Sequence, residues 1–285
     1  MRIASFTVAG RATYGLLDGS TLREAASGLR EQCPDLSSLL AAGRLEELPG
    51  RLCDETIDVD GVRFLPVVPL PGKILCVGVN YRPHVEEMGR EIPAHPVVFV
   101  RFPDSLVGHG EPLVRPRLSE QYDFEGELAV VIGRTARYVE AADAMDYVAG
   151  FVPFLDGSVR DWQRHTMQFT PGKNFPASGA VGPALVTPDE VGDVEALELS
   201  TRVSGEVMQH GRVRDLIFGI PALLEYCSAF TKLEPGDIIA TGTPGGVGAA
   251  RRPPRWLEAG DRVEVDLGPA GCLANTVVDE VYPAV

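Results

Sequence analysis

The chain has 285 residues, of which 45% are hydrophobic and 23% are charged, and its formal net charge is −14. That length suits one large domain, or a catalytic domain with a small companion, and gives a sizeable core. Because an acidic surface repels phosphate backbones and anionic lipids, we expect neither nucleic acid nor membrane as a partner. An anionic substrate would need a metal ion or specific Arg and Lys side chains to meet its charge.

Residues 1–68 are predicted to form a small α/β domain of their own. Residues 3–8 alternate like a strand, and the glycines of residues 15–19 indicate a turn. Apolar residues recur at helical spacing over residues 22–48, and Asp35 is placed to cap a helix within that stretch.

Residues 66–72 contain three prolines, which favour a stiff, extended connector, and we place the domain boundary there. The remainder, residues 69–285, is predicted to be a catalytic domain dominated by short strands. The clearest helix is residues 220–230, with Pro221 in its first turn. The fold class is therefore mixed α+β and rich in strands. The predicted strands are residues 73–79, 97–100, 125–132, 147–155, 237–241, 262–267 and 273–278.

The protein is predicted to be cytoplasmic. The N-terminus lacks the apolar run of a signal peptide, and no stretch approaches the roughly 18 apolar residues of a membrane span. The five cysteines are scattered, which favours buried thiols in a reducing compartment over disulfides or a zinc site.

Glu125 and Glu127 are the most informative pair in the sequence. They precede an apolar run at positions i and i+2, so on a strand they share one face, about 7 Å apart at the backbone. Asp156 ends another apolar run. Three carboxylates without His or Cys suit Mg²⁺, Mn²⁺ or Ca²⁺. The alternatives are a solvated edge strand for the two glutamates and a turn-forming Asp before Gly157.

His84 and Glu87 are the candidate general base and its partner. Pro83 suits a first helical turn, which places the two side chains at i and i+3 on one side of a helix. A carboxylate beside an imidazole orients the ring and raises its basicity. The alternative is an ordinary surface pair.

Positive groups and a glycine-rich loop follow. Arg160 and Lys173 lie shortly after Asp156 and together could bind an anionic substrate. Residues 241–248 form a glycine-rich loop after a strand. It is either a tight turn or a set of backbone N–H groups and a threonine hydroxyl facing an anion.

These pieces, in this order, resemble the fumarylacetoacetate hydrolase family, over roughly residues 69–280. The resemblance implies layered, rolled sheets, a homodimer, and Mg²⁺ or Mn²⁺ bound at the carboxylates. The matching stretches are residues 78–87, 123–127, 160–163, 172–173, 233–237 and 241–244. The implied roles are metal ligands for Glu125, Glu127 and Asp156, a His84–Glu87 dyad on a loop that closes over substrate, Lys173 facing the substrate oxygens, and Gln163 and Thr243 lining the site.

The family acts on small 2-oxo or 1,3-dicarbonyl acids, so the leading prediction is a metal-dependent hydrolase that cleaves a C–C bond in an acylpyruvate-like or β-diketo acid. An oxo-acid decarboxylase or a dienol/keto isomerase would use the same residues. A third hypothesis is a repurposed member that binds or acts on a larger intermediate. It rests on departures from the family pattern at Leu155, Asn174 and Pro176, where polar groups around the metal site would be lost.

Overall fold

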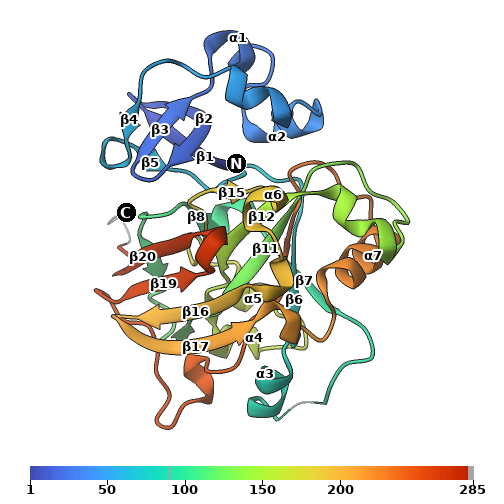
Figure 1. Cartoon of the computed structure of the whole chain (residues 1–285). Helices are drawn as coiled ribbons and strands as arrows, with labels where there is room; N and C mark the ends of the chain where they lie inside the picture. Colours follow the sequence, from blue (N-terminus) through green and yellow to red (C-terminus); the bar gives the residue numbers. More distant parts are fainter. Residues whose placement is uncertain (90, 282–285) are drawn as a thin grey trace.

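The computed structural model describes residues 1–89 and 91–281, and its fold is mixed α+β and rich in strands, as predicted. A 13-stranded sheet forms the centre and a five-stranded sheet packs beside it (Figure 1). The larger sheet contains β1 (Arg2–Val8), β2 (Arg11–Asp18), β3 (Thr21–Glu24), β4 (Ile57–Asp58), β5 (Arg63–Phe64), β6 (Ile74–Gly78), β7 (Val97–Arg101), β8 (Leu106–Val107), β11 (Gly126–Ile132), β12 (Val148–Leu155), β14 (Gly179–Val181), β15 (Leu185–Val186) and β18 (Ile238–Ala240).

The second sheet and the short helices complete the chain. The second sheet contains β9 (Leu113–Arg115), β16 (Glu198–Val203), β17 (Glu206–Arg212), β19 (Arg262–Asp266) and β20 (Cys272–Asp279), and β10 (Tyr122–Asp123) pairs with β13 (Ser158–Val159). The helices are α1 (Ser27–Arg30), α2 (Leu36–Ala41), α3 (Arg82–Glu87), α4 (Arg160–Gln163), α5 (Thr170–Lys173), α6 (Pro188–Val191) and α7 (Ile220–Phe230). Each strand predicted beyond residue 69, and the helix at residues 220–230, appears within two residues of its predicted bounds.

Strand β11 lies in the middle of the larger sheet, hydrogen-bonded to β12 on one side and β18 on the other. Its side chains alternate between two hydrophobic clusters, so all seven residues are buried. Ala129 and Val131 face the cluster that contains α2, whereas Leu128 and Val130 face the cluster that contains α7. A strand held on both faces and both edges is a rigid support for whatever its end carries.

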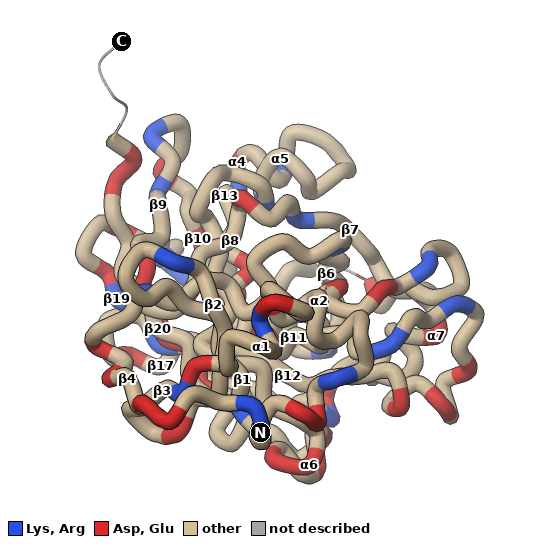
Figure 2. The backbone as a smooth tube through the Cα atoms, turned by 90° about the horizontal axis from the view of Figure 1, so that it is seen from above, with Lys and Arg blue, Asp and Glu red and all other residues tan. Residues whose placement is uncertain are grey.

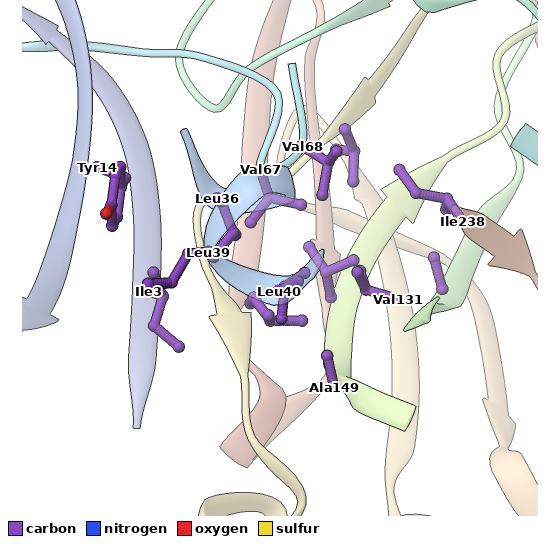
Figure 3. Close-up of a cluster of buried hydrophobic side chains, with 14 of the residues drawn as sticks. Ile3, Tyr14, Leu36, Leu39, Leu40, Val67, Val68, Val131, Ala149 and Ile238 are labelled. Atoms are coloured by element: carbon purple, nitrogen blue, oxygen red, sulfur yellow. The ribbon is translucent and has the colours of Figure 1, made fainter. Parts of the chain in front are cut away.

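The N-terminal unit continues the larger sheet, because Arg2 and Ile3 of β1 pair with Val186 and Leu185 of β15. Leu36, Leu39 and Leu40 of α2 pack into the same cluster as residues of β11 and β18 (Figure 3). The unit lies over one end of the β11–β12 region (Figure 1). The boundary between residues 68 and 69 stays a proposal; across it the sheet and the hydrophobic core are continuous.

Two local predictions for the N-terminal unit were wrong. Residues 15–18 belong to β2, and Gly15 is required because a Cβ there would lie 2.0 Å from the carbonyl oxygen of Arg23 on β3. Leu22 begins no helix: it lies in β3, where buried and exposed residues alternate, so pairing with β2 outweighs the helical spacing. Asp35 does cap α2, in a reciprocal capping box with Ser38.

Charge is dispersed over the surface. Acidic positions occur around the N-terminal unit, α6 and α7, rather than in one field (Figure 2). Within the described residues, no helix combines the length and apolar character needed to cross a membrane.

Gly126 shows why β11 and β16 approach so closely. A Cβ at this position would lie 2.0 Å from Oγ1 of Thr201 and 3.3 Å from Cγ1 of Val265, so the glycine makes room for the second sheet. The Thr201 hydroxyl is buried and has no hydrogen-bond partner among the described residues.

We therefore expect Gly126→Ala to lower the free energy of unfolding by about 1–3 kcal/mol, because it overpacks this contact. Urea unfolding of Gly126→Ala, Thr201→Ala and the double variant measures the coupling. The glycine substitution should cost clearly less when Thr201 is already Ala. Additive losses would show that the clash with Thr201 does not determine the cost.

Candidate active site

Three carboxylates meet where β11 and β12 pair. Glu125 immediately precedes β11, Glu127 is its second residue, and Asp156 follows β12. The backbone N–H of Asp156 donates to the carbonyl of Glu125 at 2.8 Å, which extends the ladder and fixes the two residues side by side. One carboxylate oxygen from each of the three residues lies within 4.8 Å of the others, and all three residues are buried.

Two cations hold Glu125. Nζ of Lys173, at the end of α5, lies 2.6 Å from Oε2 of Glu125 and 2.5 Å from Oδ2 of Asp156. Nη1 of Arg160, at the start of α4, lies 2.7 Å from Oε1 of Glu125, while its Nε lies 2.7 Å from Oδ2 of Asp123. Burial alone would raise the pKa of Glu125, but the charges of Arg160 and Lys173 outweigh it and hold that pKa well below its usual range.

Among the described residues, Glu127 forms no ion pair with Arg or Lys. Its Oε2 accepts a hydrogen bond of 2.8 Å from the backbone N–H of Gly242. Burial, followed by the negative charges of Asp156 and Glu125, raises the pKa of Glu127 well above its usual range. Of the three carboxylates, Glu127 is therefore the one whose ionised form is most opposed by its surroundings when no cation is bound.

This donor set fits a divalent cation. Three carboxylate oxygens, with no His or Cys among them, are the ligands that Mg²⁺, Mn²⁺ and Ca²⁺ prefer. A cation here would also offset the burial and the repulsion that raise the pKa of Glu127. Lys173 keeps its proton, since Asp156 and Glu125 raise its pKa although burial alone would lower it.

Arg101 is a partner of Asp156 that sequence reasoning missed. It ends β7, its side chain is fully buried, and its Nη1 lies 2.7 Å from Oδ1 of Asp156. It also donates to the carbonyl of Gly157 and to the hydroxyl of Ser178, each at 2.9 Å. Asp156 is thus held by Arg101 at one oxygen and Lys173 at the other. The signal in the sequence that could have indicated Arg101 is a charged residue directly after the apolar residues 97–100.

The candidate base faces the same cavity. Pro83 lies in the first turn of α3, as predicted, and Nδ1 of His84 lies 2.8 Å from Oε1 of Glu87. The other oxygen of Glu87 accepts a hydrogen bond of 2.8 Å from the backbone N–H of Gly246, so the carboxylate is fixed at both ends. Because the Glu87 carboxylate accepts hydrogen bonds, we assign the proton of the neutral His84 ring to Nδ1. Nε2 is then free to act as the acceptor.

The cavity has a volume of about 390 Å³, within the usual range for small-molecule sites. Its polar lining comprises His84, Glu125, Glu127, Arg160, Gln163, Arg164, Thr166, Lys173 and Thr243. Its apolar lining comprises Val77, Val79, Met88, Phe99, Met167 and Phe169, together with Gly78. Of the nine predicted site residues, only Glu87 and Asp156 lie outside this lining, and each is bonded to a residue within it.

The glycine-rich loop serves the site's own carboxylates. Gly242, Gly246 and Gly248 donate backbone hydrogen bonds of 2.8 Å to Glu127, Glu87 and Asp123, respectively. The anions that this loop meets are therefore side chains of the protein. Gly242 has φ +110°, and a Cβ there would lie 2.8 Å from the Cβ of Asn80, so only glycine fits without strain.

Thr243 and Gln163 line the cavity but are already bonded within the protein. The Thr243 hydroxyl donates to the carbonyl of Gly126 at 2.9 Å and accepts from Gln209 at 2.7 Å. Oε1 of Gln163 accepts from Nη1 of Arg160 at 3.0 Å, while the buried Nη2 of Arg160 has no partner among the described residues. The other guanidinium nitrogens of Arg160 are thus committed to Asp123, Glu125 and Gln163.

The departures at Leu155, Asn174 and Pro176 have separate places in the fold. Leu155 is buried in a hydrophobic cluster and pairs with Gly126 and Ala180. The Asn174 amide donates to the carbonyls of Val100 and Thr170 and accepts from the N–H of Phe102, which ties α5 to β7. Pro176 is exposed. Polar contacts to Asp156 come instead from Arg101.

Comparison with known proteins places this site in a family. Residues 73–278 match the family described as "Fumarylacetoacetate (FAA) hydrolase C-terminal". A mitochondrial oxaloacetate tautomerase of Bos taurus is 43% identical over 219 residues, which cover 76% of this chain and 70% of the relative.

Solved structures share the whole fold. An HpcE protein from Mycobacterium smegmatis has a TM-score of 0.88 at 34% identity, with 98% of this chain and 99% of that chain covered. The maleylpyruvate hydrolase from Sphingobium sp. SYK-6, in complex with manganese(II) and pyruvate, has a TM-score of 0.79 at 29% identity, with 98% and 99% covered.

Glu125 is paired with Arg160 and Lys173, whereas Glu127 is not. We therefore expect their glutamine variants to change the free energy of unfolding in opposite directions. In EDTA at pH 7, Glu125→Gln should lower the free energy of unfolding by about 3 kcal/mol, because it leaves Arg160 and Lys173 short of a buried counter-charge. Glu127→Gln should raise it by about 1 kcal/mol, because it removes a charge that burial and two carboxylates oppose.

Urea unfolding with and without Mn²⁺ measures both effects, with wild type as the control that Mn²⁺ stabilises. Both variants should lose that stabilisation. Equal destabilisation of the two metal-free variants would contradict the conclusion that the surroundings oppose the ionised form of Glu127 most.

Proposed function

Because the chain belongs to the fumarylacetoacetate hydrolase family, we propose that it is a divalent-metal-dependent enzyme that interconverts the keto and enol forms of a small 2-oxo acid such as oxaloacetate. The observation that carries this proposal is one cavity lined by both a carboxylate-oriented imidazole, His84, and the carboxylates Glu125 and Glu127. The name of the 43%-identical relative, an oxaloacetate tautomerase, supports this choice of reaction.

Keto–enol conversion needs one proton moved from carbon to oxygen. A divalent cation at Glu125, Glu127 and Asp156 would stabilise the negative charge that develops on the 2-oxo oxygen. Nε2 of His84 would take a proton from C3, leaving the electron pair as the new C2–C3 double bond. His84 would then deliver that proton to the 2-oxo oxygen, so neither water nor a leaving group takes part.

The remaining side chains fix the geometry of this transfer. Glu87 holds the His84 ring in place through Nδ1. Lys173 has three N–H donors, two of which meet Glu125 and Asp156, so the third is available to a substrate oxygen. The guanidinium of Arg160, which lines the cavity, would add positive charge beside the substrate carboxylate.

Hydrolytic C–C cleavage, the leading prediction from the sequence, is the second candidate. The likeness to a maleylpyruvate hydrolase solved with manganese and pyruvate favours it. The same His84 would then activate water, which attacks the distal carbonyl of a diketo acid. Decarboxylation of oxaloacetate differs again in releasing CO₂ and pyruvate. The products separate these reactions.

We expect purified protein to accelerate the loss of enol absorbance from oxaloacetate in Mg²⁺ or Mn²⁺, and EDTA to abolish the effect. In parallel assays, pyruvate formed from oxaloacetate measures decarboxylation, and pyruvate formed from acetylpyruvate measures hydrolysis. Cleavage of acetylpyruvate without tautomerisation would overturn the proposal in favour of hydrolysis. A folded protein that binds Mn²⁺ and converts neither acid would favour the hypothesis of a repurposed family member that binds or acts on a larger intermediate.

His84→Ala should lower the rate of tautomerisation by about 10²- to 10⁴-fold, the usual contribution of a general base. Glu87→Gln should lower it less, since the imidazole remains. His210→Ala is the matched control, because His210 is exposed on β17 and lies outside the cavity lining. Full activity in His84→Ala would exclude it as the base.

A further inference from the structure

Arg164 differs from the other cations of the cavity. Arg160 and Lys173 are both buried and both paired with Glu125, whereas Arg164 is exposed. Its side chain has no ion pair or hydrogen bond among the described residues, although it lines the same cavity. Its charge is therefore free to meet a ligand at the exposed side of the site.

The turn that carries Arg164 is fixed. The backbone N–H of Arg164 donates to the carbonyls of Arg160 and Asp161, each at 3.2 Å, so Arg164 follows Arg160 by one helical turn. The Trp162 ring lies 5.2 Å from the ring of Phe175 and 4.9 Å from that of His165. The contact with Phe175 holds the turn against the rest of the protein, so the Arg164 side chain begins from a backbone held in place.

The rest of the lining has a buried charged part and an apolar part. Carboxylates, His84 and Lys173 form the buried part, and Met88, Phe99, Met167 and Phe169 supply apolar walls. A ligand that fills the cavity would thus have a polar 2-oxo acid head, a short uncharged middle and, beside Arg164, a negatively charged end. The guanidinium suits a carboxylate, which it binds through two parallel N–H donors.

We propose that Arg164 determines substrate specificity by binding the second carboxylate of a 2-oxo dicarboxylic acid. The proposal rests on the proposed function for the position of the 2-oxo acid head. It assigns the chemistry to the buried residues and the choice of substrate to Arg164. The favoured substrate class is a short 2-oxo acid with a carboxylate at its far end, rather than one with an alkyl end.

The test uses two stable acids of equal chain length, 2-oxoglutarate and 2-oxopentanoate, which differ in the terminal carboxylate. Calorimetric titration in Mg²⁺ should show wild type binding the dicarboxylate about tenfold more tightly. Arg164→Gln should lose this preference and keep its affinity for the monoacid within about twofold. Arg164→Lys should retain part of this preference, since lysine keeps the positive charge but lacks the two parallel N–H donors of the guanidinium.

Arg214→Gln is the matched control, because Arg214 is exposed and lies outside the cavity lining. The proposal is overturned if wild type shows no preference, or if the preference survives in Arg164→Gln. Oxaloacetate turnover is measured on the same samples. If binding shows an Arg164-dependent preference but oxaloacetate is not turned over, the tautomerase proposal is wrong and the specificity role of Arg164 stands. If oxaloacetate is turned over but the preference is absent, the specificity role is wrong and the tautomerase proposal stands.

Discussion

The bridge from Lys173 to Glu125 and Asp156 is the interaction on which the rest of the site depends. Four carboxylates and three cations lie together: Asp123, Glu125, Glu127 and Asp156 against Arg101, Arg160 and Lys173. Buried charges persist only when they are paired and hydrogen-bonded. Here every carboxylate except Glu127 has an Arg or Lys partner, so one negative charge is left over, and it lies where a divalent cation would be bound.

This network explains the surrounding architecture. Glu125 and Asp156 must lie side by side, which the β11–β12 ladder ensures, and β11 is held on both faces and both edges. Arg101 reaches Asp156 from β7, and Asn174 ties that strand to the helix that ends in Lys173. The glycine-rich loop then donates backbone N–H groups to three carboxylates at once, a task that requires close approach of the main chain.

Much of this site could be predicted from local sequence because its chemistry is carried by strand ends. The spacing of Glu125 and Glu127 and the apolar run before Asp156 both indicated carboxylates gathered at one place. The charged residue after the apolar residues 97–100 marked Arg101 as unusual, but its partner could not be predicted because Asp156 lies 55 positions away. The same reason accounts for Gly15, whose role depends on a strand that pairs with it. The predicted helix at Leu22 failed because sheet pairing overrides spacing in a short segment.

The buried and the exposed residues of the cavity have different tasks, because only the buried charges are paired with one another. Within the buried part of the cavity, most donors and acceptors are engaged with one another, so a different substrate would meet nearly the same groups there. Discrimination between substrates must then come from residues whose side chains are not already committed, and Arg164 is such a residue in the described part of the chain. A relative named for tautomerisation is 43% identical in sequence, and a solved structure named for hydrolysis shares this fold at 29% identity. A buried centre that polarises a 2-oxo acid and a base beside it would serve either reaction, and the groups near the opening would select which acid arrives.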